Sequence, residues 1–155
     1  MPAVFGTMTT ISADEPFFVL VDDHIHSARM MRRAVREAAH LAQFAWIGNA
    51  RRAERTLARL FDQRGALRPD LVIVDLKSSS DATARFIGGV WNRLNAAGVP
   101  IVALSDHPDG DRQTLMESGA DAVFERHHDL DAYRAEIADI VSFWVRETVT
   151  WPIRA

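Results

Sequence analysis

The chain contains no cysteine, a single lysine and a single tyrosine among its 155 residues. Without cysteine there is no disulfide framework, no thiol nucleophile and no thiolate metal site. No apolar run approaches the roughly 18 residues that a membrane-spanning helix needs. The first 16 residues also lack the basic region and apolar stretch of a secretory signal. These absences predict a cytoplasmic protein with no membrane partner.

The charge balance gives no indication of a nucleic-acid partner. The formal net charge is −3 at pH 7, although arginines cluster in residues 29–36 and 51–59. Clusters at helical spacing are typical of a solvated helix face, not of a surface that binds nucleic acid. A hydrophobic content of 48% and a charged content of 25% are ordinary for a globular protein. The length suits one domain with its own core.

Short apolar runs alternate with amphipathic segments along the whole chain. The predicted strands are residues 17–21, 44–48, 71–74, 101–104 and 122–124. The predicted helices are residues 27–40, with Ser27 as a candidate cap, 50–62, 82–95 and 130–144, together with a short helix that follows a turn at 106–110 and ends at Gly119. This alternation, without any internal repeat, predicts one α/β domain with a doubly wound, five-stranded parallel sheet.

Polar residues follow three of these apolar runs. Asp75 ends the run 71–74, the pair Asp22 and Asp23 ends the first run, and Ser105 ends the fourth. Any one of them alone is ordinary at a turn or a helix cap. Together, however, they converge on the carboxyl edge of a parallel sheet, where such folds bind ligands. Clustered carboxylates suit Mg²⁺, and a carboxylate that acts as nucleophile indicates phosphoryl transfer to aspartate.

Four segments resemble the receiver domains of two-component response regulators. They are Val-Leu-Val-Asp-Asp-His at 19–24, Pro-Asp-Leu-Val-Ile-Val-Asp-Leu at 69–76, Val-Pro-Ile-Val-Ala-Leu-Ser at 99–105 and Gly-Ala-Asp-Ala-Val-Phe at 119–124. The resemblance covers about residues 17–142 and implies the flavodoxin-like receiver fold. We therefore expect a flexible leader at 1–15, a receiver domain at 16–142 and a C-terminal extension at 143–155.

The resemblance also implies a role for each matching residue. Asp75 would accept a phosphoryl group from a histidine kinase, and Ser105 would hydrogen-bond that group. Asp23, Asp75 and the main-chain carbonyl of Lys77 would hold Mg²⁺, with Asp22 acting partly through water. Such a protein would phosphorylate and dephosphorylate itself but would not turn over a metabolite. It would signal through protein–protein contacts.

The sequence departs from the receiver pattern after the fifth predicted strand. Arg126 aligns with the family's lysine, His127 with the proline that follows it, and Val123 with the switch aromatic, while the neighbouring Phe124 should point to the opposite face of the sheet. Arginine keeps the positive charge but is not equivalent to lysine. A pseudo-receiver that acts as a phosphorylation-independent interaction module therefore stays open. An aspartyl-phosphate phosphatase is disfavoured, because the position of its second aspartate is Lys77.

The end of the chain resembles single-domain regulators associated with bacterial phytochromes. The matching segments are Val-Ser-Phe-Trp-Val-Arg-Glu-Thr-Val-Thr-Trp-Pro at 141–152 and the stretch 57–69. This resemblance implies a phytochrome-type kinase and a tail that reaches a second protomer. Phe143, Trp144 and Trp151 supply apolar bulk that either folds back on its own domain or forms an interface. We expect Pro152 to stop the last helix. We also predict a homodimer whose interface includes that helix and the tail.

Overall fold

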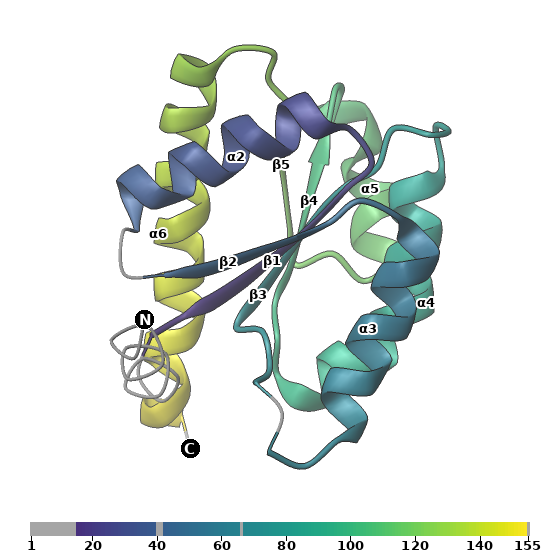
Figure 1. Cartoon of the computed structure of the whole chain (residues 1–155), viewed down its shortest axis with the longest axis vertical. Helices are drawn as coiled ribbons and strands as arrows, with labels where there is room; N and C mark the ends of the chain where they lie inside the picture. The colour runs from purple at the N-terminus through teal and green to yellow at the C-terminus, as the bar shows by residue number, and fades with distance from the viewer. Residues whose placement is uncertain (1–14, 40–41, 66, 155) are drawn as a thin grey trace, which may run out of the picture.

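The computed structural model describes residues 15–39, 42–65 and 67–154, with side chains as far as Glu147. Nearly all of the expected leader, residues 1–14, lies outside the described residues. Within those ranges five strands and five helices alternate along the chain (Figure 1). They are β1 (Phe17–Asp22), α2 (Ile25–Ala38), β2 (Gln43–Ile47), α3 (Ala50–Asp62), β3 (Leu71–Asp75), α4 (Ala82–Ala97), β4 (Ile101–Ser105), α5 (Pro108–Ser118), β5 (Ala122–Glu125) and α6 (Leu130–Arg154).

All strand pairs are parallel, and the strand order is β2-β1-β3-β4-β5. Helices α2 and α6 cover one face of this sheet, whereas α3, α4 and α5 cover the other (Figure 1). The predicted doubly wound, five-stranded α/β architecture is thus confirmed. None of the helices in the described ranges is long and apolar enough to cross a bilayer.

The two central strands divide their side chains between two cores, because successive residues of a strand point to opposite faces. One core lies under α3, α4 and α5 and includes Val19, Val21, Val72 and Val74. The other lies under α2 and α6 and includes Phe18, Leu20, Leu71 and Ile73. Full burial of each such side chain contributes roughly 1.5–3 kcal/mol of transfer free energy. Strands covered on both faces are therefore continuously apolar, which made them visible in the sequence.

Two helix starts differ from the sequence prediction. Helix α2 begins at Ile25 and not at Ser27, whose side chain is buried inside the first turn instead of capping it. Helix α5 begins at Pro108, in a segment that the sequence predicted as a turn. Proline suits this position because its fixed φ matches the first helical turn and its missing N–H would have no helical partner there.

Helix α6 corrects the prediction for the C-terminus. Its backbone stays helical from Leu130 to Arg154, so Pro152 does not stop it, and the expected boundary between 142 and 143 falls inside a helix. The ring of Trp144 packs edge-on against Phe18 at 5.2 Å, and its Nε1 donates a hydrogen bond to the Asp70 carbonyl at 3.1 Å. Trp144 therefore belongs to the core of its own chain. The side chains of the remaining tail residues, from 148 onward, lie outside the described residues.

Candidate functional site

The register of the central strands brings two carboxylates together at the carboxyl edge of the sheet. Asp22 pairs with Asp75 at the last step of the β1–β3 ladder. Their residue exposures are only 1% and 0%. A buried carboxylate is costly unless it is hydrogen-bonded or paired with a positive charge. The groups around these two side chains therefore determine what the edge can do.

Each oxygen of Asp75 faces a different cation. Oδ1 accepts a hydrogen bond from Nε of Arg126 at 2.6 Å. Oδ2 lies 2.9 Å from Nζ of Lys77, an ion pair that lacks hydrogen-bond geometry. Burial raises the pKa of Asp75, the positive charges of Lys77 and Arg126 oppose this rise, and the neighbouring Asp22 adds to it. Asp75 is thus a desolvated carboxylate flanked by two positive charges.

Asp22, Asp23 and Asp75 together form what we call the acidic edge. The ammonium group of Lys77 contacts three of its oxygens. Besides Oδ2 of Asp75, it donates to Oδ1 of Asp22 at 2.7 Å and to the main-chain oxygen of Asp75 at 3.1 Å. The sequence prediction used only the main-chain carbonyl of Lys77 and missed its side chain. The one available signal was the position of the chain's single lysine, two residues after Asp75.

Asp22 is held by neutral donors as well. Its Oδ2 accepts from the Ser27 hydroxyl at 2.6 Å, and its Oδ1 accepts from the His24 amide at 2.8 Å. Its main-chain oxygen accepts from Nε1 of Trp46 at 2.7 Å. Ser27 and Trp46 were not predicted as site residues, because their sequence patterns indicate only a helix cap and a strand.

Asp23 faces the loop after β3. Its carboxylate accepts hydrogen bonds from the amides of Lys77, at 2.9 and 3.2 Å, and of Ser78, at 3.0 Å. In the part of the chain that the structure describes, no three His, Cys, Asp or Glu side chains already form a metal-binding group. The oxygen donors nevertheless fit a hard cation, and those of Asp22 and Asp75 already contact a positive charge, the Lys77 ammonium.

Ser105 lies at the same edge but is engaged elsewhere. Its hydroxyl donates to Oδ2 of Asp111 at 2.5 Å and accepts from the His107 amide at 2.9 Å. The hydroxyl is therefore bound to the start of α5 and not to Asp75. Asp111 was missed in the sequence, since it reads there as an ordinary acidic residue in a first helical turn.

Arg126 reaches Asp75 from the end of β5, and its side chain is only 14% exposed. Its Nη1 donates to Asp106 at 2.9 Å and its Nη2 to the Leu76 carbonyl at 3.4 Å. These contacts fix the guanidinium between β3 and β4. On the strand before it, Val123 packs in the core under α3–α5, whereas Phe124 faces the α2–α6 layer, as predicted.

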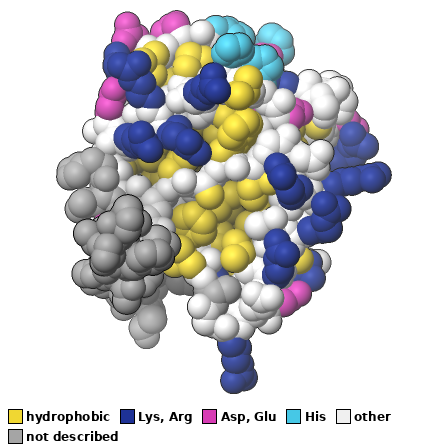
Figure 2. Space-filling view, in the orientation of Figure 1, with side chains coloured by type: hydrophobic (Ala, Val, Ile, Leu, Met, Phe, Trp, Pro, Cys, Tyr) yellow, Lys and Arg dark blue, Asp and Glu magenta, His cyan; other side chains and the backbone are white. Residues whose placement is uncertain are grey.

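A cleft of about 390 Å³ opens over this site. Histidine side chains gather at this end of the molecule, at the top of Figure 2. The cleft is lined by His24, His26, His127 and His128 together with Lys77 and Arg126. A ligand that approached Asp75 through this cleft would meet two cationic side chains.

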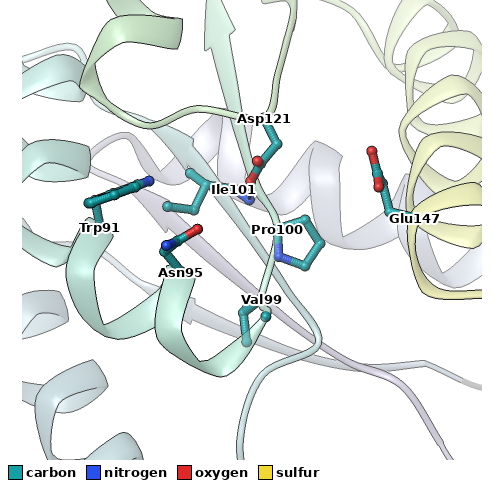
Figure 3. Close-up of a pocket in the computed structure, with 8 residues that line it drawn as sticks. Trp91, Asn95, Val99, Pro100, Ile101, Asp121 and Glu147 are labelled. Carbon is teal, nitrogen blue, oxygen red and sulfur yellow. Dashed lines mark hydrogen bonds between the residues drawn. The ribbon is translucent and has the colours of Figure 1, made fainter. Parts of the chain in front are cut away.

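A second cavity, of about 300 Å³, lies at the opposite edge of the sheet. It is lined by Trp91 on α4, by Pro100 before β4, by Asp121 before β5 and by Glu147 on α6 (Figure 3). Burial raises the pKa of Asp121, the hydrogen bond from the Ile101 amide lowers it, and the charge of Glu147 adds to the rise. None of the acidic-edge residues lines this cavity, so it is not part of the same site.

Several solved structures similar to the chain are response regulators or receiver domains of signalling proteins. The phosphorylated cyanobacterial phytochrome response regulator RcpA aligns with a TM-score of 0.71 and 17% identity, over 84% of this chain and 94% of that one. The chain has the receiver fold. The resemblance predicted from four sequence motifs is thereby confirmed at the level of the fold. No protein-family model and no curated protein matches the sequence.

Two further receivers show the range of these similar structures. Response regulator RPA3017, in red light signaling of R. palustris, has a TM-score of 0.68 and 15% identity, over 86% of this chain and 96% of that one. The receiver domain of sensor histidine kinase PA1611 from Pseudomonas aeruginosa PAO1 has a TM-score of 0.62 and 19% identity, over 84% of this chain and 98% of that one. That structure holds a magnesium ion coordinated in the active site cleft.

Proposed function

We propose that this chain accepts a phosphoryl group on Asp75 from a histidine kinase and signals through protein–protein contacts. The observation that carries the proposal is the placement of Asp75, buried at the carboxyl edge between Lys77 and Arg126. Catalysis of phosphoryl transfer depends mainly on positioning and on neutralising charge. A carboxylate held by the sheet, with two cationic side chains beside it, supports both the positioning and the charge neutralisation.

The transfer needs an ionised Asp75. One carboxylate oxygen forms the new bond to phosphorus while the bond between phosphorus and the donor's imidazole nitrogen breaks. The guanidinium of Arg126 already contacts Oδ1 and can pair with an oxygen of the arriving group. Ser105 can join only after it leaves Asp111. The phosphorylated form therefore differs from the resting form at β4 and α5.

A divalent cation, Mg²⁺, is the proposed cofactor. Asp22, Asp23, Asp75 and the main-chain carbonyl of Lys77 would hold it. When bound it would supply positive charge to the transferring group, as a metal does in other phosphoryl-transfer sites. Support comes from the oxygen donors at this edge and from the magnesium ion in the similar PA1611 receiver domain.

The proposed kinase is of the phytochrome type. Support comes from the sequence of the tail and from two similar structures, one a phytochrome response regulator and the other a regulator in red light signaling. Fewer residues are left for the proposed homodimer interface than the sequence suggested, because Phe143 and Trp144 pack within their own chain. Its interface would use the outer face of α6, where Val145 is 42% exposed, and the residues beyond it.

Phosphorylation with a small donor tests the central proposal. Incubation with acetyl phosphate and Mg²⁺ should add one acid-labile phosphoryl group to the chain, detected by mass spectrometry. Asp75→Asn should abolish this, whereas Asp109→Asn, at an exposed position of α5, should not. Stoichiometric phosphate on Asp75→Asn would assign the acceptor to another residue. A wild-type chain that takes up no phosphate, yet binds a kinase, would favour the pseudo-receiver.

A further inference from the structure

Lys77 serves the acidic edge as a metal ion would. Its Nζ lies within 2.7–3.1 Å of three oxygens, two from carboxylates and one from the main chain. The lysine side chain is 23% exposed, whereas both carboxylate side chains are 1% exposed. A single positive charge is thus enclosed mainly by oxygen on its inner side, and solvent reaches it from outside.

The two cations of the site are not interchangeable. Arg126 contacts Asp75 but makes its other bonds to Asp106 and to the Leu76 carbonyl. Among the residues that the structure describes, Lys77 is the one cationic side chain in contact with the Asp22 carboxylate. The remaining donors to that carboxylate are the neutral Ser27 hydroxyl and His24 amide. Removal of Lys77 therefore leaves a buried charge on Asp22 without a counter-ion, which is strongly unfavourable.

The backbone and the side chain of Lys77 are held separately. The Lys77 and Ser78 amides are fixed by Asp23, so the start of the loop stays in place whatever the side chain does. A lysine stem has four rotatable carbon–carbon bonds and carries a strongly hydrated charge. The ammonium can therefore swing out into the cleft without any movement of β3 or of the loop amides.

We propose that Lys77 is a tethered counter-ion that occupies the cation position of the acidic edge and that a divalent cation must displace in order to bind. The inference rests on the proposed Mg²⁺ site. Both cations use oxygens of Asp22 and Asp75, and two positive charges a few ångströms apart repel each other strongly where solvent is scarce. Metal binding at this edge is consequently a competition within the chain.

This competition has two measurable consequences. In the metal-free protein the Asp22 and Asp75 carboxylates stay paired with positive charge, so folding does not require a divalent ion. The same feature weakens metal binding, because the ion must first expel the ammonium. A variant that lacks the ammonium should show the reverse on both counts, with lower stability without metal and tighter binding of metal.

The test is a Mg²⁺ titration of the full chain and of Lys77→Met, followed by calorimetry and by the melting temperature. Methionine keeps much of the apolar stem and removes the charge. Without metal, Lys77→Met should melt below wild type, and its half-saturating Mg²⁺ concentration should be lower by about ten-fold, equivalent to about 1.4 kcal/mol. Lys77→Arg should keep the weak binding of wild type, since it keeps the charge.

Arg85→Met is the matched control. Arg85 lies in the first turn of α4, its side chain is 71% exposed, and it pairs with Asp81 away from the acidic edge, so its removal should leave the Mg²⁺ midpoint unchanged. Should Lys77→Met be unfolded without metal, refolding on addition of Mg²⁺ supports the inference, and failure to refold contradicts it. Equal midpoints for wild type and Lys77→Met would overturn the inference and leave the proposed Mg²⁺ site standing. Absence of binding to either protein would overturn both.

Discussion

The hydroxyl of Ser105, at the end of β4, donates a hydrogen bond of 2.5 Å to the carboxylate of Asp111 in the first turn of α5. The same hydroxyl accepts from the His107 amide, so its one proton and one of its lone pairs are bound by the segment that starts α5. In the proposed phosphorylated form, the phosphoryl group on Asp75 would compete with Asp111 for this donor. The exchange of one acceptor for the other would loosen the β4–α5 connection.

Asp111→Ala should favour phosphorylation. The substitution frees the Ser105 hydroxyl for a new acceptor, and a hydrogen bond is worth about 1 kcal/mol, or about five-fold in an equilibrium. At a fixed, limiting concentration of acetyl phosphate, the phosphorylated fraction should rise by a few-fold, as read from intact mass. The double variant Ser105→Ala/Asp111→Ala should lose the gain. An equal gain without Ser105 would show that the effect comes from the charge of Asp111 alone.

The phenol of Tyr133 should lose its proton at a much higher pH than an ordinary tyrosine does, because its pKa is raised. The largest contribution to its raised pKa is burial, and the negative charges of Asp75 and Asp22 raise the pKa further. Since it is the chain's one tyrosine, ultraviolet absorbance reports it directly. Tyrosinate should appear near pH 10 in denaturant and at clearly higher pH in the folded protein.

The sign of the corresponding stability change follows from proton binding. Above about pH 10 the unfolded chain loses the tyrosine proton while the folded chain keeps it, so the folded state binds more protons and its stability falls as the pH rises. Tyr133→Phe should remove this alkaline loss from the pH profile of the unfolding free energy. A folded protein that forms tyrosinate at the same pH as the denatured chain would contradict the burial of Tyr133.

Trp144 should contribute to the stability of the monomer. Trp144→Ala removes the contact with Phe18 and the hydrogen bond to Asp70, and loss of a large aromatic side chain from a core costs roughly 3–5 kcal/mol. Because Trp144 is partly buried, we expect a loss near the lower end, measured by chemical denaturation. Met116→Ala, at an exposed position of α5, should change stability by less than about 0.5 kcal/mol. Equal effects of both substitutions would contradict the packing of Trp144.

The homodimer prediction is best tested by truncation after Glu147. This cut keeps Phe143 and Trp144, which the core needs, and removes only the last eight residues. If the tail forms the interface, the full chain should be a dimer and the truncated chain a monomer by light scattering, at the same melting temperature in dilute solution. A full chain that stays monomeric at high concentration would end the proposal.

The strands and the acidic edge were predictable because both depend on local patterns. A strand buried on both faces must be apolar throughout, and parallel pairing fixes which residues share its carboxyl end, so Asp22 and Asp75 follow from the runs before them. The direction of a flexible side chain is not local. From the sequence alone, the side chain of Lys77 could equally well point into solvent. Only the fold shows that it reaches Asp22.

The C-terminal helix shows the same limit. Phe143 and Trp144 look superfluous in the sequence, because the sheet they cover is formed by residues far away in the chain. Phe18 precedes Trp144 by more than a hundred positions, yet the two rings are in contact. Ser105 gives a further example, since its place at the edge was predictable but its partner Asp111 depends on where α5 begins.

The lone lysine also gives the chain an unusual chemical handle. Apart from the α-amino group, the protein has one primary amine, and it belongs to the side chain that bridges Asp22 and Asp75. Besides the α-amino group, an amine-directed acylating reagent can therefore label the molecule only at this edge. The extent of labelling then measures how often this amine leaves its carboxylates, in a protein that needs no engineering to report it.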